Sequence, residues 1–248
     1  MHKLGAHLSI SGGYNKALER IKKIGGNCLQ IFSTSPRGWS FAKINEVDTI
    51  NFRNLKQKLK IDPVYFHASY LINLADDGKT GNLSKLSLIS ELSIASKLNI
   101  KGSVVHLGSY KEKNSQYDFN TDRDQSRITP NKYLILIKNI QRILDITPKE
   151  SLFIIENAGN RKIGNQLEEI AQIIKDVNDN RVRVCLDTCH LFSAGYDLSS
   201  KIKFEKFLNY FDKKIGLNKL ELWHFNDSRD PFGSLRDRHE NIGQGTIG

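Results

Sequence analysis

A carboxylate and an imidazole stand three residues apart directly after an apolar run. They are Asp187 and His190, in the segment VCLDTCHLFSAG that extends from Val184 to Gly195. Histidine nitrogen combined with carboxylate oxygen suits zinc or manganese better than calcium, which takes oxygen ligands, or an iron–sulfur cluster, which takes thiolates. The two residues could share one metal ion, serve two ions, or bind none.

Geometry favours two ions for this pair. In an extended backbone, residues three apart have Cα atoms about 10 Å apart and side chains on opposite faces. We therefore predict that Asp187 and His190 serve neighbouring ions, which in phosphoryl-transfer sites lie roughly 3.5–4 Å apart. Further donors follow in LRDRHENIGQG, where Asp237 and His239 project to the same side if that segment is extended. Cys189 is expected to pack as a small apolar side chain.

The elements that must position these residues are visible as seven short apolar runs separated by segments of helical periodicity. This alternation is typical of βα units around a parallel sheet. The runs begin at Leu4, Cys28, Pro63, Gly102, Ser151, Val182 and Leu220. A length of 248 residues matches one (β/α)₈ barrel, so we expect a single domain over residues 1–248.

The connections between the runs also carry structural signals. Ala17, Leu18, Ile21 and Ile24 lie on one face of a predicted helix and are expected in the core. The polar segment 108–130 lacks periodicity and predicts a surface loop.

Polar side chains recur at or next to the carboxyl ends of five successive runs. They are His67, His106, Glu156, Asp187 and His224. Barrels and open α/β sheets both place their chemistry at this end of the strands. Unpaired imidazoles and carboxylates are costly to bury, so five in succession indicate a shared metal site and not five independent core residues.

Composition limits the class of protein. The 37 Lys and Arg residues exceed the 27 Asp and Glu residues, which gives a formal net charge of +10 and favours a polyanionic partner such as nucleic acid. Cys28, Cys185 and Cys189 form no CxxC pair, which argues against a disulfide framework and a thiolate zinc site. The sequence has no signal-peptide pattern and no apolar stretch of membrane-spanning length. We expect a cytoplasmic protein that does not associate with membranes.

Two long motifs carry a family resemblance. VCLDTCHLFSAG, together with HFNDSRDPFGSLRDRHENIGQG from His224 to Gly245, closely resembles the endonuclease IV family, the family-2 apurinic/apyrimidinic endonucleases. Shorter matches are GAHLSISGG, FSTSPRGW, HASYLINLA, HLGS and IIENAG, so the resemblance covers essentially the whole chain. It implies a TIM barrel with three zinc ions that hydrolyses the phosphodiester 5′ to an abasic site in duplex DNA.

The resemblance also implies a role for each polar residue. It assigns the first zinc to His67, His106 and Glu156, the second to Asp187 and His224, and the third to His190, Asp237 and His239. Glu156 is implied as the catalytic residue that bridges the first two ions. The residues implied to penetrate the minor groove at the lesion are Arg37, Tyr70 and Leu71.

The implied mechanism is metal-assisted hydrolysis, in which zinc lowers the pKa of water towards 7 and stabilises the transition state. Duplex DNA should be bent and its abasic sugar expelled, because a phosphate in regular B-form cannot reach a barrel floor. We expect a monomer. Two further questions stay open: whether manganese replaces zinc, and whether a 3′-phosphodiesterase activity accompanies incision.

The chain departs from the family pattern in two places. Arg229 stands where the family usually has lysine, which keeps the charge but changes hydrogen-bond geometry. The family also supplies a glutamate ligand of the second zinc from its eighth strand, whereas the sequence ends at Gly248, after the seventh run. We therefore expect a barrel that is incomplete at its C-terminus and a weakened second zinc site.

Two other functions are compatible with the pattern. A metal-dependent sugar isomerase on a related barrel would share the strand-end His, Asp and Glu residues, but it needs two metals and leaves Asp237 and His239 unexplained. A non-catalytic binder of abasic DNA is the second alternative, because the eighth strand is missing.

Overall fold

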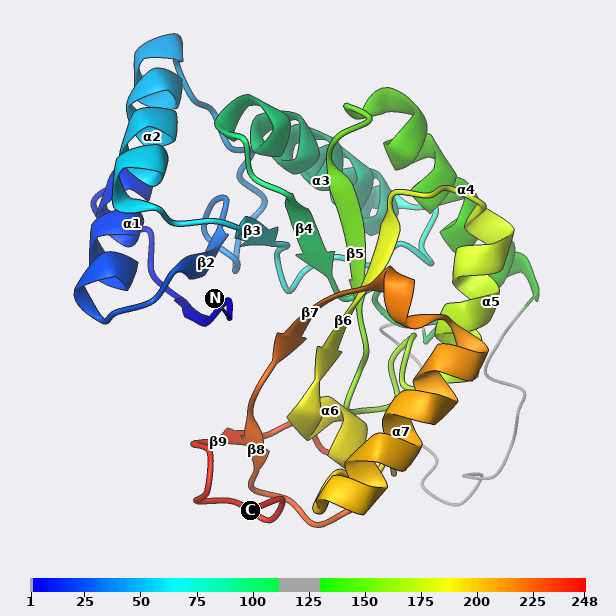
Figure 1. Ribbon diagram of the computed structural model, residues 1–248. Coiled ribbons are helices and arrows are strands. Elements are labelled where there is room, and N and C mark those ends of the chain that lie inside the picture. Colours follow the sequence, from blue (N-terminus) through cyan, green and yellow to red (C-terminus); the bar gives the residue numbers. More distant parts are fainter. Residues whose placement is uncertain (1, 112–129) are drawn as a thin grey trace.

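A parallel sheet of seven strands forms the centre of the molecule. The computed structural model describes residues 2–111 and 130–248, and its strands follow one another in sequence order across the sheet (Figure 1). They are β1 (Gly5–His7), β2 (Cys28–Phe32), β3 (Val64–His67), β4 (Gly102–Val105), β5 (Leu152–Glu156), β6 (Val182–Asp187) and β7 (Leu220–His224). Each predicted apolar run therefore forms one strand, and each neighbouring pair is parallel.

Helices connect the strands and lie outside the sheet in Figure 1. They are α1 (Tyr14–Lys23), α2 (Glu46–Leu59), α3 (Lys79–Leu98), α4 (Pro130–Ile146), α5 (Leu167–Val177), α6 (Thr188–Ser193) and α7 (Lys201–Lys214), with a 3₁₀ turn at Leu217–Lys219. After β7, the short strands β8 (Asp227–Ser228) and β9 (His239–Glu240) form an antiparallel pair. The predicted barrel-type α/β fold is confirmed as a curled, partly closed barrel, and the described residues form no eighth parallel strand.

The helix that follows β1 shows both the strength and the limit of the apolar pattern. Ala17, Leu18 and Ile21 are fully buried, as predicted. The pattern places Ile24 on the same face, but Ile24 is 63% exposed. Ile24 is the C-cap of this helix, and the chain reverses directly after it through Gly25, whose φ is 85°, so the apolar stripe ends on a residue at the exposed end of the helix.

Most apolar side chains pack between the sheet and its helices, while a smaller cluster fills the barrel interior. Tyr65, Val104, Ile154 and Cys185 form this interior cluster. The hydroxyl of Tyr65 on β3 donates to a carboxylate oxygen of Glu221 on β7 at 2.7 Å. Because the two strands lie four places apart in the sheet, this bond holds the sheet in its curled form.

Two further findings concern the predicted connections and the membrane. Most of the predicted surface loop at 108–130 lies outside the described residues.

Within residues 2–111 and 130–248, no helix combines the length and apolar character needed to cross a bilayer.

A buried carboxyl group outside the strand-end residues joins α3 to the sheet. Glu91 is 3% exposed and accepts hydrogen bonds from the hydroxyls of Ser33, directly after β2, and Ser103, on β4. Burial raises the pKa of Glu91 to about 7, against the opposing effect of the two hydroxyl bonds. The folded protein therefore favours the neutral acid up to about neutral pH.

This shift predicts how Glu91→Gln changes stability. The carboxyl of the unfolded chain ionises near pH 4.5, whereas that of the folded chain stays protonated to about pH 7, so its stabilisation is lost as pH rises between these values. Glutamine does not ionise. We expect the variant to match the wild type below pH 4.5 and to gain about 1–3 kcal/mol in unfolding free energy at pH 8. Denaturant unfolding at both pH values checks this, and an equal effect at both would contradict it.

Candidate metal centre

All eight predicted ligand residues gather at the carboxyl end of the sheet. His67, Glu156, Asp187 and His224 are the last residues of β3, β5, β6 and β7, and His106 directly follows β4. The other three lie on α6 and around β9: His190, Asp237 and His239. Parallel strands in sequence order bring the strand-end residues together, because every strand ends at the same edge of the barrel.

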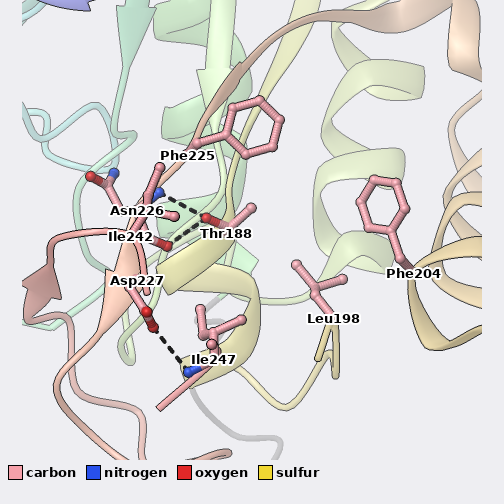
Figure 2. Close-up of a pocket in the computed structure, with 9 residues that line it drawn as sticks. Thr188, Leu198, Phe204, Phe225, Asn226, Asp227, Ile242 and Ile247 are labelled. Carbon is pink, nitrogen blue, oxygen red and sulfur yellow. Dashed lines mark hydrogen bonds between the residues drawn. The ribbon is translucent and has the colours of Figure 1, made fainter. Parts of the chain in front are cut away.

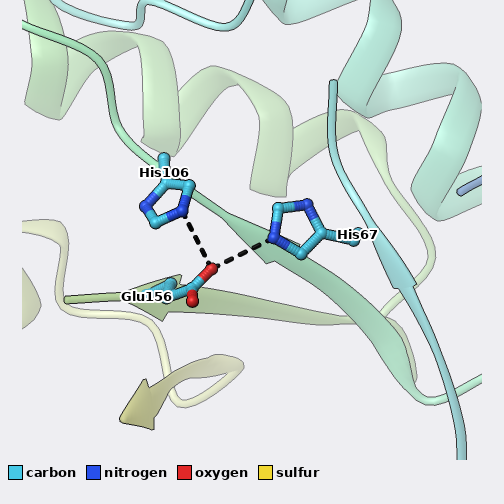
Figure 3. Close-up of side chains that lie close together, drawn as sticks. All are labelled: His67, His106 and Glu156. Carbon is cyan, nitrogen blue, oxygen red and sulfur yellow. Dashed lines mark hydrogen bonds and ion pairs between the residues drawn. The ribbon is translucent and has the colours of Figure 1, made fainter. Parts of the chain in front are cut away.

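The inner cluster is built around one carboxylate. The Nε2 atoms of His67 and His106 each lie 3.1 Å from Oε2 of Glu156 (Figure 3). Nδ1 of His224 lies 2.8 Å from the other oxygen, Oε1. Glu156 is 2% exposed, so three imidazoles from three different strands surround a carboxylate that water hardly reaches.

The outer cluster joins two buried residues, Asp187 and His190, to two exposed ones, Asp237 and His239. Nε2 of His190 is 3.0 Å from Oδ1 of Asp237 and 3.1 Å from Nε2 of His239. Asp187, His190 and His239 each place a ligand atom within 4.8 Å of the others. The spacing is compatible with a common cation.

The extended backbone assumed for Asp187 and His190 is wrong. Asp187 is the N-cap of α6, and its Oδ1 accepts a hydrogen bond from the backbone N–H of His190 at 3.1 Å. The chain therefore turns into a helix directly after β6, and the two side chains can approach one site. Oδ2 of Asp187 lies 3.8 Å from Nε2 of His239 and 4.0 Å from Nδ1 of His224. The division of this pair between two ions stays a prediction.

The segment with Asp237 and His239 behaves as predicted, because their ligand atoms lie only 3.2 Å apart. The residue between them anchors the segment. The guanidinium of Arg238 donates two hydrogen bonds, of 2.7 and 2.5 Å, to the carboxylate of Asp230, which is 2% exposed. A bidentate pair of this kind fixes the backbone from which the two ligands project.

A second carboxylate, Asp227, anchors the loop that follows β9. It accepts backbone hydrogen bonds of 3.0 Å from Gly243 and Gly245 and of 2.9 Å from Ile247, the last shown in Figure 2. Figure 2 also shows Thr188, whose hydroxyl donates to the carbonyl of Asn226 at 2.6 Å and accepts from its N–H at 2.9 Å. These bonds fix the chain after β7 against the start of α6.

Two asparagines that the sequence did not single out support Asp187. The amide of Asn226 donates to its Oδ2 at 2.6 Å, and the side-chain oxygen of Asn157 accepts from its backbone N–H at 2.7 Å. The carbonyl of Asn157 also lies 2.8 Å from Nδ1 of His190. The motif IIENAG contains Asn157 beside Glu156, but no pattern indicates which of its atoms would be used.

Hydrogen-bond chemistry tests whether these residues suit a metal ion. Nδ1 of His67 lies 2.8 Å from the carbonyl oxygen of Ala68, and Nδ1 of His190 lies 2.8 Å from that of Asn157. A carbonyl oxygen only accepts, so both Nδ1 atoms carry hydrogen. In a neutral ring, each Nε2 then directs a lone pair at a carboxylate oxygen. Either a proton on Nε2 or a metal ion between the two atoms relieves this contact, and the nitrogen and oxygen donors fit a divalent metal such as zinc.

The charges of the clusters reinforce this conclusion. Although burial lowers it, the carboxylates of Asp187, Asp237 and Glu156 raise the pKa of His190 to about 10. Burial also acts against ionisation of Glu156, yet the histidines around it hold its pKa well below the usual range. Glu156 therefore stays ionised, and the carboxylates favour positive charge on the imidazoles of both clusters.

Cys189 packs as predicted. It is fully buried, and burial raises the pKa of its thiol to about 11. Its sulfur atom lies close enough to Asp237 and His239 for a three-residue metal site. A thiol with a raised pKa is a poor source of thiolate at neutral pH, so the histidine and carboxylate ligands are the better donors.

The three predicted DNA-contacting residues lie on two neighbouring loops. Tyr70 and Leu71, after β3, are 61% and 36% exposed, and Arg37, after β2, is also exposed. The hydroxyl of Ser69 donates to the carbonyl of Pro36 at 2.8 Å and joins the loops. The ring of Tyr70 lies 6.1 Å from that of His67, so Tyr70 stands directly beside the inner cluster and Leu71 follows it in the same loop.

Comparison with known proteins places the chain in a family. Residues 18–248 match the xylose isomerase-like TIM barrel family. The probable endonuclease 4 of Halothermothrix orenii is 38% identical over 253 residues, covering 99% of this chain and 85% of that protein. The crystal structure of endonuclease IV from Thermus thermophilus is 30% identical and superposes with a TM-score of 0.82 over 98% of this chain and 82% of its own.

The chain belongs to the endonuclease IV family. The resemblance predicted from the motifs is therefore confirmed, together with the enzyme class of the family, a hydrolase that cleaves DNA. A D-tagatose 3-epimerase-like protein has a TM-score of 0.71 over 98% of this chain and 82% of its own, but only 18% identity, so that likeness concerns the fold alone.

The position of Glu156 predicts the effect of Glu156→Gln on metal content. Glutamine keeps the size of the side chain but removes the charge that three imidazoles share, so we expect the variant to lose at least one zinc ion per chain. Elemental analysis after dialysis against zinc measures this. Glu91→Gln is the control for an amide substitution at a buried position, because Glu91 is about as buried as Glu156, lies outside the clusters and is already neutral in the folded protein up to about neutral pH. Equal zinc content in both variants and the wild type would contradict the prediction.

Proposed function

We propose that this member of the endonuclease IV family is a zinc-dependent DNA repair enzyme that hydrolyses the phosphodiester 5′ to abasic sites in duplex DNA. The observation that carries the proposal is the placement of the exposed Tyr70 and Leu71 beside two linked clusters of imidazoles and carboxylates. Family membership supports cleavage of DNA, and the geometry supports the choice of lesion.

Eight residues would hold three zinc ions in this proposal. The inner cluster would supply His67, His106 and Glu156, with Glu156 extending to His224 and Asp187. His190, Asp237 and His239 would hold the outermost ion. The short distances from Glu156 to three imidazoles support its role as the catalytic, bridging carboxylate.

Metal ions bound there would supply Lewis acidity, which offsets the charge of a phosphodiester and makes water a stronger nucleophile at neutral pH. The protein itself contributes a fixed, mostly buried arrangement of donors. Glu156 and Asp187, which are 2% and 0% exposed, fix the positions of the imidazoles around them. The bond between Arg238 and Asp230 holds Asp237 and His239 over the clusters. Such preorganisation avoids rearrangement during the reaction.

Exposed side chains would bring the phosphate to the clusters. A phosphate in regular duplex cannot reach residues as buried as His67 and Glu156. Tyr70 and Leu71 are adjacent in sequence and present apolar surface to solvent, and apolar wedges of this kind can open base steps. Arg37 would enter the minor groove together with them, and the net charge of +10 would attract the duplex.

The sharpest test of the proposal is incision of a duplex with one synthetic abasic site. We expect cleavage on the 5′ side that leaves a 3′-hydroxyl, in buffer without magnesium, and loss of activity after dialysis against a zinc chelator. Glu156→Gln should cut at least about 100-fold more slowly, because the charge that joins the clusters is gone. Cleavage that requires magnesium and continues after zinc is removed by the chelator would contradict the proposal.

DNA reading and metal binding should be separable. Replacing Tyr70 and Leu71 together with alanine should weaken binding to abasic duplex about 10-fold or more, because stacking and wedging contacts are lost. Zinc content should not change, because neither side chain is a proposed ligand. Leu134→Ala, at a 64% exposed position on α4, is the matched control and should leave binding unchanged. If zinc content fell in step with affinity, Tyr70 and Leu71 would be structural residues of the metal centre.

A further inference from the structure

A glutamine far from His224 in sequence contacts the ring nitrogen of His224 that faces away from Glu156. Nδ1 of His224 faces Glu156, and Nε2 lies 3.0 Å from the side-chain oxygen Oε1 of Gln30 on β2. Gln30 is 7% exposed. An amide oxygen only accepts hydrogen bonds, so this contact places a hydrogen on Nε2 of His224. The lone pair of the neutral ring is then on Nδ1, the atom that faces the inner cluster.

The orientation of the Gln30 amide is itself determined by a neighbour. Its NH₂ group lies 3.1 Å from Nδ1 of His7, the residue paired with Gln30 across β1 and β2. The His7 ring packs against the rings of Phe32 and His67, whose centroids lie 4.4 Å and 5.6 Å from its own. In this arrangement Nδ1 of His7 accepts from the amide, and a rotation that exchanged the oxygen and NH₂ positions would require both His7 and His224 to change tautomer.

Gln30 differs from the corresponding partners of two other ligands. His67 and His190 each direct their outer nitrogen at a backbone carbonyl, of Ala68 and Asn157 respectively. No side-chain substitution removes those acceptors. The acceptor for His224 is a side chain, so the protonation of this one ring can be changed by mutation.

We propose that Gln30 is a positioning residue that holds the hydrogen of His224 on Nε2 and thereby keeps Nδ1 free to bind a metal ion. His7 takes part indirectly by fixing the amide of Gln30. The proposal rests on the metal centre of the proposed function, but not on the identity of the DNA substrate. It adds two residues, from β1 and β2, to a site otherwise built from β3 to β9.

The experiment compares Gln30→Leu with Gln30→Glu. Leucine fills a similar volume without an acceptor, whereas glutamate keeps an oxygen that can accept from Nε2. Two readouts apply: the zinc dissociation constants from chelator competition, and the ring tautomer of His224 from nitrogen-15 NMR of histidine-labelled protein. We expect Gln30→Leu to weaken the site that contains His224 about 10- to 100-fold and to lower the fraction of His224 rings that carry hydrogen on Nε2. Gln30→Glu should stay within a few-fold of wild type and keep the Nε2–H form.

A second variant covers the case in which Gln30→Leu fails to fold. His7→Phe keeps an aromatic ring against Phe32 and His67 but removes the acceptor for the Gln30 amide. It should weaken zinc binding a few-fold at the same site and leave the other zinc dissociation constants unchanged. A structural role alone would lower the melting temperature without changing the tautomer.

The outcomes separate this inference from the proposed function, because neither readout involves DNA. A protein that ignores abasic DNA, yet shows the expected tautomer and zinc effects, would overturn the proposed substrate and support the role of Gln30. Unchanged zinc affinity and an unchanged tautomer in Gln30→Leu, or in His7→Phe if the leucine variant does not fold, would overturn that role. A wild-type chain that binds no zinc would overturn both.

Discussion

The structure depends on one unfavourable juxtaposition, the burial of the Glu156 carboxylate among imidazoles. An ionised carboxylate is costly to remove from water unless opposite charge compensates it. His67 and His190 donate their outer hydrogens to backbone carbonyls, so their inner nitrogens face carboxylates as acceptors. Positive charge between these groups resolves the conflict, and a divalent metal supplies more of it than a proton can.

The rest of the fold maintains this arrangement. Strands in sequence order deliver one donor each to the same edge, while the bond between Tyr65 and Glu221 holds β3 and β7 across the interior. The Arg238–Asp230 pair brings Asp237 and His239 over the site from a segment with little regular structure. Rigid strands carry most of the candidate metal ligands, while Tyr70 and Leu71, which we propose contact DNA, are exposed on a loop.

The apolar pattern predicts the strands well and the helix ends less well. Strand runs rich in β-branched residues are short and clearly bounded, so all seven can be recognised. Ile24 fits a helical period but lies beyond the last helical turn, because Gly25 reverses the chain there. The prediction for Asp187 and His190 assumes an extended backbone, whereas the side chain of Asp187 caps a helix that begins at the next residue. Periodicity identifies elements, but capping decides where one element becomes another.

The sequence by itself determined the family, the barrel class and the set of candidate metal-ligating residues. It could do so because strand-end positions are fixed by the apolar runs, and the side chains at those positions are unusual for a core. Only the tertiary structure decided which atoms face each other. Gln30 contacts the outer ring nitrogen of His224, Asn157 accepts from the backbone N–H of Asp187, and His7 contacts the amide of Gln30. Glutamine and asparagine are common polar residues without a diagnostic spacing. Their roles arise from contacts between strands and loops far apart in sequence, and no local pattern records such contacts.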